Sequence, residues 1–218
     1  MPRIIDILLS SLALLCLLPL LIPIVLILLL TGEHKVFYFQ TRVGYKNKDF
    51  KIIKFATMLS NSANIGSGSL TLKNDPRVLP FGSFLRKTKI NELPQILNII
   101  IGDLAIVGPR PQMQVDFEKY SVEVQKKIYN IRPGLTGIGS IIFRDEESLI
   151  SLAAENENPH EFYTRVIAPY KGELEMWYQE NRSLVLDLRL ILMTVWVIAF
   201  PGTKLYEKWF GDAPKQKF

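Results

Sequence analysis

The chain has 218 residues, 48% of them hydrophobic and 22% charged, and carries a formal net charge of +5 at pH 7. That length suffices for one sizeable domain with an appendage, and the composition is apolar for a soluble protein of this size. A single cysteine excludes a disulfide framework, and two isolated histidines argue against a zinc site.

The N-terminal segment is far more apolar than the rest of the chain. No charged side chain occurs between Ile7 and Gly32. A helix of that length would be roughly 39 Å long, more than the hydrocarbon core of a bilayer requires. We therefore expect a membrane helix in residues 1–32 and a membrane-surface domain in residues 33–218. The alternative is a buried helix of a soluble domain.

Two prolines, Pro19 and Pro23, lie inside this apolar segment on one helix face. Each removes a backbone donor and crowds the carbonyl four residues earlier, so we expect a kink. A sharp bend would leave two arms that are each too short to cross a bilayer, and the helix would then be re-entrant. The prolines alone leave both a re-entrant and a spanning helix open.

The positive charge belongs to the part of the chain after the apolar segment. Arg3 and Asp6 cancel, so residues 31–218 carry the whole excess. A basic body beside a membrane helix favours the cytoplasmic side and attraction to anionic headgroups or phosphorylated substrates. No helix combines basic and aromatic residues as nucleic-acid binders do, so we expect no nucleic-acid partner.

Short alternating segments follow the apolar helix. Residues 36–40 and 50–55 predict two strands joined by a basic turn, an antiparallel hairpin whose turn is either solvated or rests on lipid headgroups. Residues 60–70 predict a surface loop, because their glycines match no phosphate-binding fingerprint. Residues 104–107 predict a short buried strand.

Residues 86–111 concentrate the polar chemistry of the chain. A helix ending at Gly102 is predicted there by apolar residues with spacing i, i+3, i+4, i+7, namely Leu93, Ile96, Leu97 and Ile100. Asn91 then takes the N-cap position and Glu92 the first turn, which is ordinary helix capping. The functional alternative is a site for a phosphate and a divalent cation, formed by this carboxylate and the neighbouring cations.

Three arginines could contribute to such a site. Arg86 precedes the Asn-Glu pair, whereas Arg110 and Arg132 lie on turns stiffened by proline. Arginines on stiff turns suit bidentate phosphate recognition because little entropy is lost on binding. Either turn arginine could instead be an ordinary ion-pair partner.

Two helices are predicted in the C-terminal part. Residues 168–181 predict a polar helix, and residues 183–201 a second apolar one. Asp187 and Arg189 interrupt the latter and leave too few uncharged residues for a span. One face carries Leu184, Leu188, Ile191, Leu192, Val195 and Ile198. We expect an amphipathic helix in the membrane interface, with a buried core helix as the alternative.

Four strings carry a resemblance to a known family: FYFQTRVG, FKIIKFATM, DPRVLPFGSFLRKTKINELPQILNIIIGDLAIVGPRP and RPGLTGIGS. Together with the proline-containing apolar helix they resemble the bacterial sugar transferases, also called monotopic phosphoglycosyl transferases, over nearly the whole chain. The resemblance implies an enzyme of the bacterial inner membrane with its catalytic domain on the cytoplasmic face. Such an enzyme uses Mg²⁺ to transfer a sugar-1-phosphate from a UDP-sugar to undecaprenyl phosphate, which releases UMP and starts the assembly of an exopolysaccharide, O-antigen or capsule.

The resemblance also implies a fold. We expect a membrane-associated α+β protein with a re-entrant helix kinked at Pro19 and Pro23, a small antiparallel sheet, and several helices including a C-terminal interfacial amphipathic one. The partners it implies are the nucleotide sugar, undecaprenyl phosphate and the lipid bilayer, and it leaves room for a homodimer.

The family's catalytic dyad is Asp-Glu, in which the Asp is the nucleophile. Here those positions hold Asn91 and Glu92, and Glu92 is the expected metal ligand. The resemblance assigns phosphate binding to Lys54, Arg86, Arg110 and Arg132. Two further departures are Ala56, where the family usually has a basic residue, and Ile138-Gly139, where it often has Trp-Ala.

Asn91 leaves three hypotheses. In an active transferase, Glu92 either attacks phosphorus itself or holds Mg²⁺ while the lipid phosphate attacks directly. A catalytically impaired or non-catalytic membrane component of glycan assembly would bind its ligands without turnover, because a carboxamide is a weak nucleophile and a poor Mg²⁺ ligand. A peripheral scaffold would only bind anionic lipid.

Overall fold

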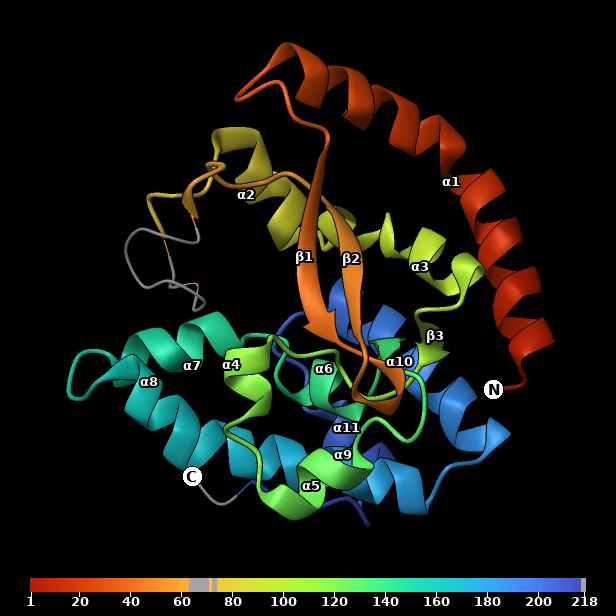
Figure 1. The fold of residues 1–218 in the computed structure, drawn as a ribbon, viewed down its shortest axis with the longest axis vertical. Coiled ribbons are helices and arrows are strands. Elements are labelled where there is room, and N and C mark those ends of the chain that lie inside the picture. The colour runs from red at the N-terminus through yellow and green to blue at the C-terminus, as the bar shows by residue number, and fades with distance from the viewer. Residues whose placement is uncertain (63–70, 72–73, 217–218) are drawn as a thin grey trace.

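The structure, a computed structural model, describes residues 1–62, 71 and 74–216. One long helix, α1 (Arg3–Leu30), follows the outer edge of a body made of shorter helices and two small sheets (Figure 1). The expected mixture of helices and a small sheet behind one long apolar helix is confirmed. Most of the loop predicted at residues 60–70 lies outside the described residues.

Helix α1 passes through Pro19 and Pro23 without interruption. The predicted kink therefore takes the form of a gradual curve, and α1 forms one arc along the body (Figure 1). By length and composition α1 could cross a membrane, and most of its apolar stretch is not buried by the body. Its exposed side chains include Ile4, Leu8, Leu12, Leu15, Ile22, Leu26 and Leu30.

The N-terminal end of α1 is attached to the body by two charged residues. Arg3 donates hydrogen bonds to the carbonyls of Ile99 and Leu104, near the C-terminal end of α3 (Gln95–Ile101). A cation suits this position because the last carbonyls of a helix lack intrahelical partners. Asp6 accepts a hydrogen bond from the backbone of Ile106 at 3.3 Å.

The C-terminal end of α1 is attached by apolar packing. Ile24 and Leu28 are buried in one cluster with Phe55 and Leu85. Both ends of α1 thus contact the same folded body, and its buried residues are confined to these two ends.

The predicted hairpin is present. Strands β1 (Phe37–Val43) and β2 (Asp49–Phe55) pair antiparallel, with Phe37 opposite Phe55. The short helical turn η1 (Tyr45–Asn47) joins them, and Lys46 N donates to Tyr129 O at 2.8 Å. The basic turn is therefore attached to the body at the segment that follows α5 (Val122–Lys127).

A second sheet pairs β3 (Ala105–Val107) with β4 (Gly134–Thr136) in parallel. The strand predicted at residues 104–107 is confirmed, but its partner was not predicted from the sequence. Backbone meets backbone where β4 begins and β3 has just ended: a Cβ added at Gly134 would lie 2.1 Å from Gly108 N. Glycine is required there because any side chain would separate the two segments.

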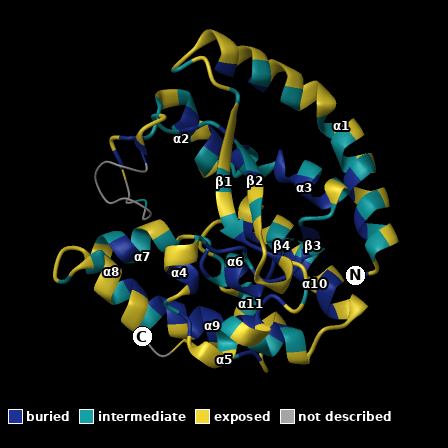
Figure 2. Cartoon of the chain, in the orientation of Figure 1, coloured by how far each residue is buried: buried dark blue, intermediate teal, exposed yellow. Residues whose placement is uncertain are grey.

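The remaining helices surround these sheets. They are α2 (Pro80–Lys87), η3 (Ile90–Glu92), α4 (Gln114–Phe117), α6 (Ile138–Ile142), α7 (Glu146–Ala153), α8 (Pro159–Phe162), η4 (Tyr163–Ile167), α9 (Ala168–Glu180), α10 (Leu184–Ala199) and α11 (Leu205–Trp209). The main core lies between α6, α9 and α10, where Figure 2 shows the densest burial. Its fully buried members include Tyr129, Ile138, Leu174, Tyr178, Leu190 and Met193.

Helix α10 is apolar on two sides, not amphipathic. Its inner face, with Leu186, Leu190, Met193 and Val197, is buried in the main core. Most of the predicted apolar face points outward instead, with Leu184, Leu188, Leu192 and Val195 between 48% and 63% exposed. The expected amphipathic pattern is wrong because the second face serves the core of the body.

Candidate active site

The Asn-Glu pair lies in a turn of its own before the central helix. The predicted helix ends at Gly102, which has a left-handed φ of 110°, but its N-terminus is later than expected. Helix α3 begins after Pro94, and Asn91 and Glu92 belong to the preceding 3-10 turn η3. The prediction of Asn91 as N-cap is therefore wrong. Pro94, which has no backbone N–H group to be satisfied, takes that position.

Glu92 binds two cations from distant parts of the chain. Lys54 on β2 places Nζ 3.0 Å from Glu92 Oε1. Arg110, on the turn after β3, places Nη2 2.8 Å from Oε1 and Nη1 3.5 Å from Oε2. The Glu92 and Lys54 side chains are 17% and 15% exposed, so these contacts are only partly screened by water.

These neighbours determine the protonation of the cluster. Burial opposes ionisation of Glu92, but Arg110 and Lys54 outweigh it and hold the pKa of Glu92 well below its ordinary value. Burial lowers the pKa of Lys54 to about 8, against the attraction of Glu92. Burial likewise lowers the pKa of Lys89, a third cation near Glu92. At neutral pH the site is a carboxylate surrounded by an excess of positive charge.

Two buried side chains, Tyr129 and Glu175, bind the backbone of the turn that carries Arg110. Tyr129 OH donates to Arg110 O at 2.9 Å, and Arg110 N donates to Glu175 Oε1 at 3.4 Å. Burial raises the pKa of Glu175 to about 8. A Cβ at Gly139 would lie 2.4 Å from the Glu175 carboxyl, so glycine at this position leaves room for Glu175.

Sequence reasoning missed Glu175. The signal was present, since Lys171, Leu174, Glu175 and Tyr178 have the i, i+3, i+4, i+7 spacing of a buried helix face. A carboxylate on such a face is rarely buried without a partner, and here the partner is the backbone of Arg110.

Several buried polar atoms around the cluster lack a hydrogen-bond partner among the described residues. They are Asn91 Oδ1, Gln95 Nε2, Ser140 Oγ, Arg144 Nε and Glu175 Oε2. Two of them adjoin Arg110 directly: Asn91 precedes Glu92, and the other carboxylate oxygen of Glu175 accepts from Arg110 N. Buried polar groups are normally satisfied, and an unsatisfied group often indicates a missing water, ion or ligand. These atoms are therefore available to a polar ligand.

Two of the predicted phosphate-binding arginines lie elsewhere. Arg86 pairs with Glu147 on α7 and contacts Met58 Sδ at 3.7 Å. Arg132 donates from Nε to Gly102 O at 3.0 Å, at the C-terminal end of α3, and its guanidinium lies 5.1 Å from the Tyr45 ring centroid. No contact joins either arginine to Glu92 in the described part of the chain. Of the four predicted cations, Lys54 and Arg110 meet Glu92.

A comparison with known families decides the identity of this arrangement. The family model described as Bacterial sugar transferase matches residues 1–201. The chain belongs to the bacterial sugar transferase family. The resemblance inferred from the four sequence strings is thereby confirmed.

This sugar transferase is similar to proteins of two sizes. The exopolysaccharide production protein ExoY of Sinorhizobium fredii (strain NBRC 101917 / NGR234) is 32% identical over 204 residues, which cover 87% of this chain and 81% of ExoY. The UDP-N-acetylgalactosamine-undecaprenyl-phosphate N-acetylgalactosaminephosphotransferase of Aeromonas hydrophila is 31% identical, with 87% of this chain but 41% of that protein covered. The UDP-glucose:undecaprenyl-phosphate glucose-1-phosphate transferase of Klebsiella pneumoniae is 31% identical, with 88% and 39% covered.

The sugar transferase offers few ligands for a metal. Among the described residues, no group of three or more His, Cys, Asp or Glu side chains could hold an ion. Glu92 supplies one carboxylate, and Asn91, the preceding residue of η3, carries a buried amide oxygen, Oδ1, without a partner among the described residues. One carboxylate is enough for an ion such as Mg²⁺, which is commonly held by one or two carboxylates and otherwise by water and substrate phosphates. Glu92 is therefore the ligand that suits it, and Asn91 adds only a weaker, neutral oxygen.

Proposed function

We propose that this protein transfers a sugar-1-phosphate from a UDP-sugar to undecaprenyl phosphate at the cytoplasmic face of the bacterial inner membrane. This would be the first step of a surface glycan assembly. One observation carries the proposal: Lys54 and Arg110 meet at the half-buried carboxylate of Glu92. The activities for which the Aeromonas and Klebsiella relatives are named support the choice of donor and acceptor.

The two cations suit a diphosphate. Arg110 presents a planar guanidinium on a turn that Tyr129 and Glu175 hold in place, so little entropy is lost when it binds phosphate oxygens. Lys54 adds a compact charge from another direction. A bound diphosphate would share both cations with Glu92 and would neutralise the excess of positive charge.

The route of transfer follows from the residues at the dyad. Asn91 is a neutral carboxamide and a poor nucleophile, and both oxygens of Glu92 are engaged by cations. We therefore favour direct attack by an oxygen of the lipid phosphate on the sugar-bearing phosphorus. A P–O bond forms there, the bond from that phosphorus to the bridging oxygen breaks, and the bridging oxygen leaves with UMP.

Mg²⁺ remains part of the proposal. Glu92 and Asn91 are the residues that would hold it, together with phosphate oxygens of the substrates. Bound there, the ion would neutralise charge on the phosphates during transfer.

The position of α1 supports a re-entrant course. Arg3 attaches one end of the helix to the body, and Leu28 packs against the body near the other end. A helix crossing the bilayer would have to draw this polar body into hydrocarbon, where unsatisfied polar groups cost several kcal/mol each. We propose that α1 dips into one leaflet and returns, with the outer face of α10 at the same surface.

A second candidate function is favoured by Asn91 alone. Without the family's nucleophile, the protein would bind nucleotide sugar or lipid phosphate in a glycan assembly complex without turnover. The third hypothesis, a scaffold that only binds anionic lipid, gains no support from Lys54 and Glu92, because these half-buried residues pair with each other.

Release of UMP separates these functions. Purified native protein and Asn91→Asp are each incubated with undecaprenyl phosphate, Mg²⁺ and a panel of UDP-sugars. UMP from the native protein supports the transferase. If only Asn91→Asp releases UMP, the native chain is an impaired enzyme. Thermal stabilisation by UDP-sugar without UMP from either form supports the binding component and refutes the transferase.

A further inference from the structure

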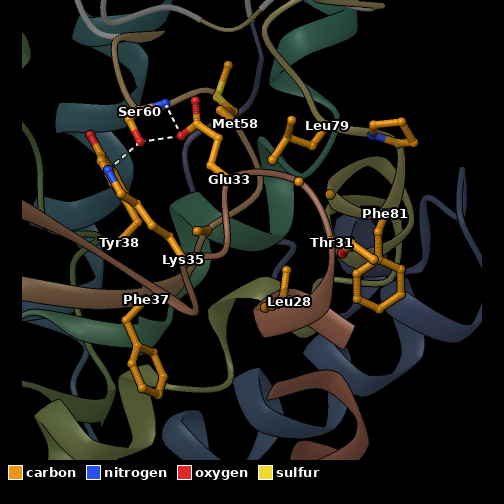
Figure 3. Close-up of a pocket in the computed structure, with 14 residues that line it drawn as sticks. Leu28, Thr31, Glu33, Lys35, Phe37, Tyr38, Met58, Ser60, Leu79 and Phe81 are labelled. Carbon is orange, nitrogen blue, oxygen red and sulfur yellow. Dashed lines mark hydrogen bonds between the residues drawn. The ribbon is translucent and has the colours of Figure 1, made fainter. Parts of the chain in front are cut away.

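An apolar cavity of about 230 Å³ lies between the C-terminal end of α1, the beginning of β1, the end of β2 and the beginning of α2 (Figure 3). Its mainly apolar lining includes Leu28, Tyr38, Ala56, Met58, Leu79 and Phe81. Ligand pockets for whole drug-sized molecules are usually about 300–1,000 Å³. This cavity therefore suits a segment of a larger apolar ligand.

The polar groups at one side of the cavity are already paired with one another. Lys35 Nζ donates to Ser60 Oγ at 2.7 Å, and Ser60 N donates to Glu33 Oε2 at 2.8 Å (Figure 3). A nucleobase or a sugar needs several free donors and acceptors, and these residues have each other as partners. The lining thus favours hydrocarbon over either half of the nucleotide sugar.

The cavity adjoins the apolar surface of α1. Leu28 lines it, and the neighbouring Leu29 and Leu30 are 46% and 78% exposed. The polar residues that follow, from Thr31 to Lys35, mark the end of the apolar run and hence the expected depth of the headgroups. A hydrocarbon chain could enter from the bilayer along α1 without crossing a polar surface.

The cavity also adjoins the charged cluster. Tyr38 lines it and is the direct cross-strand partner of Lys54, whose ammonium binds Glu92. Residues opposed in an antiparallel pair lie about 5 Å apart on the same face. Ala56 lines the cavity two residues after Lys54, on that same face and about 7 Å along the strand. Met58, another lining residue of the cavity, contacts Arg86.

Ala56 gives this chain its particular form of the cavity. Ala56 is in the lining, and a long side chain at this position would occupy the space beside Lys54. The methyl group of Ala56 leaves that space open and apolar.

We propose that this cavity binds the isoprene units next to the phosphate of a polyprenyl phosphate acceptor, whose phosphate then reaches Lys54. The inference rests on the proposed function for the nature of the acceptor, and adds where its hydrocarbon lies. The first isoprene units occupy the space beside Ala56, and the rest of the chain follows α1 into the bilayer.

Filling the cavity tests the proposal by kinetics. Ala56→Leu adds three carbons to the lining, and Ala154→Leu makes the same change at the exposed C-cap residue of α7 as control. In whichever form releases UMP, Ala56→Leu raises KM for undecaprenyl phosphate about tenfold and leaves KM for the UDP-sugar unchanged. A change in KM for the UDP-sugar alone, or no change in either with a normal melting temperature, overturns the proposal.

Photolabelling tests it without turnover. A benzophenone-bearing geranyl phosphate is crosslinked to full-length protein in phosphatidylcholine nanodiscs, and the labelled peptides are mapped. We expect labels in residues 28–38, 56–60 and 79–82, loss of labelling in Ala56→Leu, and competition by undecaprenyl phosphate but not by phosphatidylglycerol. Equal competition by phosphatidylglycerol would identify a phospholipid-tail site and overturn the proposal, as would labels confined to other segments.

The two measurements separate this inference from the proposed function. Labelling at the cavity without UMP release from native protein or Asn91→Asp supports the cavity and refutes the transferase. UMP release together with labels confined to other segments supports the transferase and refutes the cavity as the lipid site. If Ala56→Leu does not fold, the peptide map of the native protein still decides.

Discussion

Arg110 donates to both carboxylate oxygens of Glu92, with Nη2 2.8 Å from Oε1 and Nη1 3.5 Å from Oε2. The two residues come from different turns, and each is close to a proline that stiffens its backbone. The guanidinium is thus oriented before any substrate arrives, which is the condition under which binding energy is not spent on ordering side chains.

Arg110→Lys should weaken catalysis with little effect on folding. Lysine keeps the charge but replaces a planar two-point contact by a point charge, and hydrogen bonds to charged groups contribute about 1.5–3 kcal/mol. We expect kcat/KM for the UDP-sugar to fall roughly tenfold to a hundredfold, measured as UMP release. Arg165→Lys changes an exposed arginine paired with Glu157 and is the control. Equal rates for Arg110→Lys and the control would contradict this role.

Activity should fall as the pH rises above about 8. Burial lowers the pKa of Lys54 to about 8, so the free enzyme loses a phosphate-binding cation in that range. The pH profile of kcat/KM reports groups of the free enzyme and should show this step. In Lys54→Arg the cation persists and the alkaline fall should move to higher pH. A profile that is unchanged by Lys54→Arg would assign the fall to another group.

Glu175 should make the protein less stable as the pH rises. Its pKa is raised to about 8 by burial, so between its unfolded value near 4.5 and about 8 the folded state holds a proton that the unfolded state has released. Stability is therefore lost with increasing pH, by up to about 1.4 kcal/mol per pH unit. Glu175→Gln imitates the neutral carboxyl and should flatten this slope in denaturant unfolding between pH 5 and 8.

The control for this measurement is Glu123→Gln. Glu123 is exposed, and its hydrogen bond with Lys127 lowers the pKa of Glu123. The protonation of Glu123 therefore affects stability only at pH values below about 5. A slope equally reduced in both variants would show that Glu175 is not the group responsible.

Both ends of α1 should be accessible from the same side of the membrane. In a Cys16→Ser background, single cysteines replace Pro2 and His34, which are exposed at the two ends of the helix. A re-entrant helix predicts that an impermeant maleimide labels neither in intact cells and both in permeabilised cells. Labelling of one position in intact cells would demonstrate a spanning helix instead.

The sequence predicted the parts of the fold that depend on local periodicity. Alternation along residues 36–40 and 50–55 indicated the hairpin, and the spacing from Leu93 to Ile100 indicated α3. Strand β4 was missed because its three residues lie in a segment rich in proline and glycine, and its pairing with β3 depends on a non-local approach of two glycines. The sequence carries no periodic signal for such a contact.

The candidate site was predicted in part. Lys54, Glu92 and Arg110 were named from the sequence, and the structure joins them. Arg86 and Arg132 have the same residue type in similar contexts but pair with Glu147 and Gly102. Side-chain direction decides between these outcomes, and proximity along the chain does not determine it.

The close approach of Gly108 and Gly134 has a consequence for how such proteins diverge. The loop bearing Arg110 packs against bare main chain, because a Cβ on Gly134 would lie only 2.1 Å from Gly108 N. Substitutions in the surrounding core can alter size and shape without altering this spacing. The distance between these two loops is therefore set by contact between their main chains and not by the size of any side chain.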